Sequence, residues 1–168
     1  MNVTEATVDD AARLLELRES LSSWLIGRGI HQWLPKSLGI ESLEREINEG
    51  SVFVAHDGGE LVGSLTIVRE DERIWGQTPG DADYVHRLMV DRRWSGHGVG
   101  SDLLAWARRR AEVSGRHWLR LDCAENNSAL RAYYEKVGFR CVGLRDIAGL
   151  LPDGGAVALF EMSLTPTG

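Results

Sequence analysis

The chain has 168 residues, of which 43% are hydrophobic and 26% charged, and its formal net charge is −6. A chain of this size can bury a core without the help of metals or disulfides, so we expect one domain over residues 1–168. The acidic net charge argues against nucleic-acid binding, and no apolar run reaches the roughly 20 residues of a membrane span. The two cysteines are too few for a disulfide framework. Together these observations predict a cytoplasmic protein with neither nucleic-acid nor membrane partners.

The first half of the chain predicts two helices followed by a hairpin. A short strand over residues 3–6 precedes a helix whose leucines repeat at helical spacing, and a second helical pattern covers residues 40–48. The irregular segment between the helices contains Trp33, an aromatic residue that either plugs the core or lines a pocket. Two β-rich runs, residues 51–56 and 60–69, are joined by an Asp-Gly-Gly sequence, which is a strong hairpin signal.

The central part of the chain predicts a strand, a glycine-rich turn and a helix in direct succession. Residues 70–83 are acidic and predict a solvated loop, and residues 84–90 predict a hydrophobic strand. The turn beyond contains Gly96, Gly98 and Gly100, which let the backbone approach a ligand closely, and the following helix points unpaired N–H groups at the same place. Six arginines against two aspartates lie between His86 and Arg110, in an otherwise acidic chain. This arrangement predicts a phosphate-binding site, with Arg92 and Arg93 as further anion candidates.

The C-terminal part predicts strands over residues 118–123, 140–143 and 156–163, with a Pro-Asp-Gly-Gly turn at residues 152–155 before the last. A helix that Asn127 caps and that a glycine ends lies between the first two strands. The predicted order of strands and helices is that of an α/β protein.

The turn alone does not identify its ligand. A Walker phosphate loop needs a Gly-Lys pair, and none occurs in the chain. A dinucleotide fingerprint needs a third glycine, and Ser101 stands in its place. The common nucleotides therefore fit poorly.

A second block of sequence narrows the choice. Residues 127–139, NSALRAYYEKVGF, and the glycine turn together resemble the GCN5-related N-acetyltransferase superfamily. The signature of that superfamily is an R/Q-x-x-G-x-G/A turn followed by an Asn-capped helix that ends in Tyr-Glu-Lys-x-Gly-Phe. The resemblance spans about residues 51–145, and its best register aligns Ser95, Gly98 and Gly100 with the turn motif. A serine therefore stands where the family has arginine or glutamine.

The resemblance implies a fold and a coenzyme. The fold is α/β (α+β): a mixed, mostly antiparallel sheet of about six to seven strands, flanked by about four helices, with a V-shaped splay between the two central parallel strands. Acetyl-CoA would lie in that splay, between residues 84–90 and 118–123, with its diphosphate on residues 96–101. The residues expected to bind coenzyme A are Leu88, Met89, Val90, Ser95, Gly96, His97, Gly98, Val99, Gly100, Ser101, Asn127, Tyr133 and Tyr134.

Acetyl transfer to an amine needs a proton acceptor for the amine and a proton donor for the departing thiolate. The resemblance gives Tyr134 the position of the general acid. His86 is the candidate base, expected on the same strand face as Leu88. Asp83 or the carboxylates of residues 70–72, acting through water, are the alternative.

The remaining parts of the mechanism need little help from side chains. The resemblance implies that a backbone N–H from residues 88–90 polarises the thioester carbonyl. Covalent catalysis by Cys123 is a competing route, but the adjacent Asp122 would raise the pKa of the thiol and make it less reactive. We therefore expect direct transfer in a ternary complex.

Aromatic and acidic residues near the strand ends suit a cationic acceptor: a small-molecule amine, a protein lysine or a protein N-terminus. The candidate acceptor-binding residues are Trp33, Trp75, Asp83 and Tyr84. No metal is expected, and the protein is expected to be a monomer or a homodimer. Two other classes stay open, a catalytically silent acyl-CoA-binding sensor of the same fold and a nucleotide-binding domain.

Overall fold

The computed structural model describes residues 1–149 and 155–164. Within these residues seven strands form one sheet in the order β1-β2-β3-β4-β5-β7-β6, in which β4 and β5 are parallel and the other neighbours antiparallel. The strands are β1 (Asn2–Glu5), β2 (Val52–Asp57), β3 (Glu60–Val68), β4 (Ala82–Val90), β5 (Trp118–Ala124), β6 (Arg140–Asp146) and β7 (Ala156–Ser163). The predicted fold class is confirmed.

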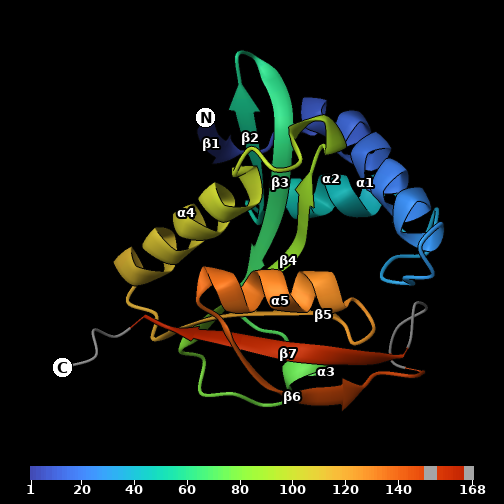
Figure 1. Ribbon diagram of the computed structural model, residues 1–168. Coiled ribbons are helices and arrows are strands. Elements are labelled where there is room, and N and C mark those ends of the chain that lie inside the picture. Colours follow the sequence, from blue (N-terminus) through green and yellow to red (C-terminus); the bar gives the residue numbers. More distant parts are fainter. Residues whose placement is uncertain (150–154, 165–168) are drawn as a thin grey trace.

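Helices cover both faces of this sheet. They are α1 (Ala11–Ile26), α2 (Ile40–Asn48), α3 (Glu72–Trp75), α4 (Val99–Val113) and α5 (Ser128–Val137). The helices α1 and α2 share a buried cluster with Val54 and Met89, whereas α4 and α5 share the main core cluster with Leu65 and Phe160. In Figure 1, α2 lies behind β3 and β4, and α5 lies in front of β5. No helix of the described ranges is long and apolar enough to span a membrane.

The ends of α5 follow the predicted signals. The side chain of Asn127 accepts a hydrogen bond from the Leu130 N–H at 3.1 Å, a cap worth about 1 kcal/mol. After the helix, Gly138 adopts a φ of 109°, and the Phe139 N–H reaches the Tyr134 carbonyl at 3.0 Å. The register of Tyr134 on α5 is thus fixed at both ends of the helix.

The acidic run before β4 contains a helical turn that the sequence did not indicate. The side chain of Asp71 caps α3 by accepting a hydrogen bond from the Ile74 N–H at 3.3 Å, and Ile74 is buried. A helix of one turn has no periodicity for a sequence pattern to detect. In addition, β6 extends past Gly143 to Asp146. The predicted turn at residues 152–155 lies outside the described residues except for Gly155.

The parallel strands β4 and β5 separate partway along their length. Their pairing runs from Ala82 opposite Trp118 to Val85 opposite Leu121, although β4 continues to Val90 and β5 to Ala124. The edge of β4 that faces β5 therefore has no strand partner beyond Val85. This is the predicted V-shaped splay.

A bulge in β4 lies at the same place. Ser64 opposes Met89 and Thr66 opposes His86, so Leu65 faces two residues, Arg87 and Leu88. Arg87 has a φ of 47°, and the extra residue reverses the alternation of the side chains that follow it.

The reversal is visible in the packing of β4. Val85 and Leu88 pack in the main core, whereas Met89 packs in the α1/α2 cluster. An unbroken strand would put Val85 and Met89 on one face, because they are four positions apart. His86 pairs with Thr66 before the bulge and lies on the face opposite Leu88. The expectation that His86 and Leu88 share a face is therefore wrong.

Candidate active site

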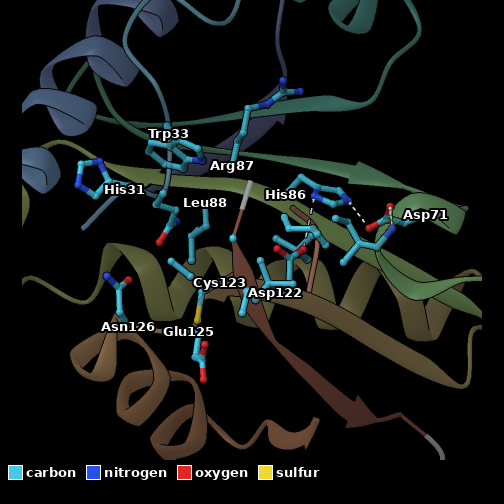
Figure 2. A pocket seen from close by; sticks show the side chains of 18 of the residues that line it. His31, Trp33, Asp71, His86, Arg87, Leu88, Asp122, Cys123, Glu125 and Asn126 are labelled. Carbon is cyan, nitrogen blue, oxygen red and sulfur yellow. Dashed lines mark hydrogen bonds and ion pairs between the residues drawn. The ribbon is translucent and has the colours of Figure 1, made fainter. Parts of the chain in front are cut away.

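A cavity of about 560 Å³ opens where β4 and β5 separate (Figure 2). Besides β4 and β5, its walls come from the segment between α1 and α2, the start of α3, the turn between β5 and α5, and α5 itself. Residues just after β6 and at the start of β7 complete them. In Figure 2, Trp33 and Leu88 lie toward one end of the cavity and Asp71 lies at the other, whereas the side chain of Arg87 points away from the group. Asp71, Asp122 and Glu125 are the acidic residues that line it in the described part of the chain.

His86 and Asp122 lie at the apex of the splay. They are the first residues of β4 and β5 beyond the last paired positions, Val85 and Leu121. The Nδ1 atom of His86 lies 4.0 Å from Oδ1 of Asp122, and its Nε2 atom lies 3.2 Å from Oδ2 of Asp71 (Figure 2). One imidazole is thus flanked by two carboxylates inside the cavity.

This arrangement changes the proton affinity of the group. Burial lowers the pKa of His86, but the hydrogen bond to Asp71 and the charges of Asp122 and Asp71 outweigh it, and the net pKa is raised above 6.5. Burial raises the pKa of Asp122 to about 6, against an opposing effect of His86. The imidazole therefore holds a proton more strongly than an ordinary histidine, and Asp122 holds one more strongly than an ordinary aspartate.

The same three side chains have ligand atoms within 4.8 Å of one another, a spacing that would also admit a cation. That the protein needs no metal stays a prediction.

Tyr134 lines the cavity from α5 and is 4% exposed. Its ring packs against Phe160 and Phe139, with centroids 5.6 Å and 6.0 Å away. Burial raises the pKa of its hydroxyl well above 10, so the phenol stays protonated. Cys123 lies on the opposing strand, and burial raises the pKa of its thiol to about 12, which leaves it a poor nucleophile.

The glycine turn has the predicted conformation. Gly96 and Gly98 have φ angles of 81° and 83°, which favour glycine, and α4 begins at the next residue. Open space surrounds the positions that a Cβ would occupy at either glycine. The first N–H groups of α4 have no partner within the helix and face this turn. Ser95 and His97 are exposed beside it.

Contacts within the protein hold the start of α4 against α5 and β3. The Tyr133 hydroxyl lies 3.2 Å from the Ser101 hydroxyl, and a Cβ on Gly100 would lie 2.8 Å from the same Tyr133 oxygen. A Cβ on Gly63 of β3 would lie 3.0 Å from Cδ1 of Leu103 and 3.1 Å from Cγ1 of Val99, so α4 packs closely over this glycine. The group that lies close to the Gly100 backbone is thus the Tyr133 hydroxyl of the protein itself.

The side chains of several predicted binding residues already contact other parts of the protein. The side chain of Asn127 caps α5 and donates to Gln32 at 3.3 Å, Val99 is buried in the core, and Met89 points toward α1 and α2. Arg93 hydrogen bonds Asp91 at 3.0 Å. Any contact of Asn127, Val99 or Met89 with a coenzyme would involve their backbone.

Three of the four predicted acceptor residues do not line the cavity. Asp83 is 2% exposed and pairs with Arg116 at 3.0 Å. Tyr84 is 1% exposed and its hydroxyl bonds Thr78 at 2.8 Å, while Trp75 packs against its ring. Trp33 lines the cavity. An acceptor role for Asp83 as base or ligand is not supported, because its carboxylate is buried and already paired.

Other lining residues had no role in the sequence analysis. They include His31, Gln32, Arg73, Glu125 and Asn126, and Asp122 had been considered only as a neighbour of Cys123. The pairing register of β4 with β5 is the signal that would have placed Asp122 beside His86.

The fold and the sequence both have close relatives. The profile of the acetyltransferase (GNAT) family matches residues 15–139. The uncharacterized N-acetyltransferase YesJ of Bacillus subtilis (strain 168) is 30% identical over 167 residues, which cover 95% of this chain and 88% of YesJ. The N-alpha-acetyltransferase RimI of Mycobacterium tuberculosis (strain ATCC 25618 / H37Rv) is 36% identical over 91 residues, 54% of this chain and 52% of RimI.

Two solved structures illustrate the likeness in fold. An acetyltransferase of the GNAT family from Listeria monocytogenes 4b F2365 has a TM-score of 0.76 and 25% identity, covering 96% of this chain and 94% of its own. The yncA protein of Salmonella typhimurium, solved with its cofactor acetyl-CoA, has a TM-score of 0.74 and 16% identity. The match covers 100% of this chain and 96% of the yncA chain. With a family profile that matches residues 15–139 and a 30% identical relative that aligns with 95% of this chain, the chain belongs to the acetyltransferase (GNAT) family.

Proposed function

We propose that the protein transfers an acetyl group from acetyl-CoA to a primary amine by direct attack in a ternary complex. One observation carries this proposal: the β4–β5 splay opens into a cavity that holds a paired histidine at its apex and a buried tyrosine on its wall. Family membership and the acetyl-CoA bound by yncA support the choice of coenzyme. The diphosphate would bind at the turn that precedes α4, on backbone N–H groups.

His86 is the proton acceptor in this proposal. An alkyl amine with a pKa near 10.4 carries a proton at pH 7, and removing it costs about 4.6 kcal/mol. Asp71 and Asp122 raise the pKa of His86 and so make it a better acceptor. The neutral amine then attacks the thioester carbon, and an N–H group on the unpaired edge of β4 polarises the carbonyl.

Tyr134 is the proton donor. Its hydroxyl hydrogen bonds the sulfur as the C–S bond breaks, and burial keeps the phenol protonated until then. The raised pKa of Cys123 supports direct transfer over a covalent acetyl-cysteine.

The acceptor is proposed to be an amine that arrives as a cation, since Asp71, Asp122 and Glu125 line the cavity beside Trp33. We expect a panel of small amines and peptides with free N-termini, assayed by release of the coenzyme thiol, to contain substrates of this class. RimI is an N-alpha-acetyltransferase, so N-terminal peptides belong in the panel. Acetyl-CoA binding without transfer to any amine would instead indicate a silent acyl-CoA sensor, and stronger thermal stabilisation by NAD or ATP than by coenzyme A would indicate a nucleotide-binding domain.

The pH dependence offers a separate test of His86. The imidazole must be neutral to accept a proton, so kcat/KM should rise with pH through its raised pKa. Asp71→Asn keeps the cap on α3 but removes a carboxylate that raises this pKa, so the rise should move to lower pH. Glu72→Gln makes the same change of charge one residue away, on an exposed side chain, and should leave the profile in place. A profile that is the same in all three proteins would contradict the role of His86.

A further inference from the structure

The segment that joins α1 to α2 forms one wall of the cavity. Its residues His31, Gln32 and Trp33 line the cavity, and residues 30–39 contain no helix or strand. Such a segment has few backbone hydrogen bonds of its own, so side chains from elsewhere must fix its position.

Arg18 of α1 makes the largest set of these contacts. Its side chain is buried, its Nη2 donates to the Ser37 hydroxyl at 2.8 Å, and its Nη1 donates to the Leu34 carbonyl at 3.3 Å. The guanidinium carbon also lies 5.8 Å from the centre of the Trp33 ring. One planar cation thus contacts three successive parts of the wall.

Neighbours of Arg18 on the same helix complete the attachment. The Glu19 carboxylate pairs with Arg18 at 3.1 Å and accepts the Lys36 N–H at 3.0 Å, at a residue whose φ is 59°. The Ser22 hydroxyl donates to the Trp33 carbonyl at 2.8 Å. Lys36 is therefore held in a left-handed conformation that costs energy without such support.

The N-terminal end of the segment is attached to the turn between β5 and α5. Asn126 donates to the Gly29 carbonyl and Asn127 donates to the Gln32 side chain, each at 3.3 Å. Arg18 also acts near the cavity itself, since burial and then the charge of Arg18 lower the pKa of Arg87, which lines the cavity, to about 10. The wall is thus held by the β5–α5 turn near Gln32 and by α1 near Ser37, with Arg18 next to Trp33.

We propose that Arg18 is a positioning residue for the acceptor: it holds Trp33 in place as the surface against which the acceptor packs. The proposal rests on the proposed acetyl transfer. The contacts given above for Arg18 all lie within residues 19–37, and none involves the glycine turn, so its loss should affect the acceptor and spare the coenzyme.

A double-mutant cycle tests the coupling. Arg18→Met should raise the acceptor KM about tenfold and leave kcat and the KM for acetyl-CoA within about twofold, because the acceptor binding that is lost is equally strong in the ground state and the transition state. Trp33→Ala should have a similar effect, and the double variant should be no worse than either single one. Additive losses, or an equal rise in the KM for acetyl-CoA, would show that Arg18 acts through general stability and overturn the proposal.

Two further variants serve as controls, one a milder change at the same contact and one a similar change outside the wall. Ser37→Ala removes one exposed hydroxyl that bonds Arg18, so it should raise the acceptor KM by a smaller factor and add nothing to Arg18→Met. Arg28→Met removes an arginine that stacks on Trp24 at 4.1 Å, outside the wall, and should leave the acceptor KM unchanged.

Hydrogen exchange separates this proposal from the proposed function. The Lys36 and Ser37 amides, which donate to Glu19 and to the Leu34 carbonyl, should exchange faster in Arg18→Met than in the parent protein. Unchanged exchange would overturn the positioning role whatever the activity. Failure of the parent protein to acetylate any amine would count against the proposed function alone, because the exchange experiment needs no turnover.

Discussion

Replacing Tyr134 by phenylalanine should lower kcat about 100-fold and leave the KM for acetyl-CoA within about twofold. Phenylalanine keeps the ring that packs against Phe139 and Phe160, so the core and α5 stay in place. What is lost is the hydroxyl that protonates the departing thiolate. Initial rates at saturating acceptor, with coenzyme affinity measured by calorimetry, separate the two quantities.

Tyr133→Phe is the matched control. It removes the neighbouring hydroxyl, which lies 3.2 Å from Ser101 at the start of α4. This change should weaken coenzyme binding and leave kcat near that of the parent protein. Equal losses of kcat in the two variants would remove Tyr134 from the mechanism.

His86→Gln should lower kcat/KM by about 100-fold at pH 7, and the deficit should shrink as the pH rises. Glutamine can still hydrogen bond Asp71 but cannot accept the amine proton. Deprotonation of the amine by solvent becomes easier toward its own pKa near 10.4, so the base matters less there. Rates between pH 6 and 9.5 would reveal the trend.

His117→Gln provides the comparison for this variant. His117 also lies near a carboxylate, 3.6 Å from Asp81, but its side chain is 60% exposed and does not line the cavity. It should behave like the parent protein at every pH. A deficit in His86→Gln that is constant across pH would argue for a packing role of the imidazole.

The parts of the site that local sequence determines could be predicted. The glycine turn depends on backbone conformations that Gly96 and Gly98 alone provide, and α5 depends on the Asn127 cap. Both features lie within a few residues of their cause. Tyr134 could be placed because the Tyr-Glu-Lys-x-Gly-Phe run that carries the resemblance is itself local sequence.

The apex of the splay could not be predicted in the same way. His86 and Asp122 meet because β4 and β5 pair only as far as Val85 and Leu121, and a parallel register between distant strands leaves no local pattern. Asp71 joins them through α3, a helix too short to be periodic.

Charge counts also failed to distinguish a solvated carboxylate from a buried one. Asp83 lies in an acidic run that suggested exposure, yet it is 2% exposed and paired with Arg116. Tyr84 and Trp75 suggested an aromatic pocket and form a packed contact instead, with centroids 5.9 Å apart. Composition indicates which groups are present but not which neighbours satisfy them.

The bulge in β4 has a consequence for how such a site changes. Arg87 is the additional residue, so a chain lacking it would keep Val85, His86, Leu88 and Met89 on their present faces. It would nonetheless restore one-to-one pairing with β3 and lose the bend that a bulge imposes. The opening between β4 and β5 therefore depends on the number of residues in β4 as well as on which residues they are. A one-residue insertion or deletion in β4 would therefore change the shape of this site even in a chain that keeps His86, Asp122 and Tyr134.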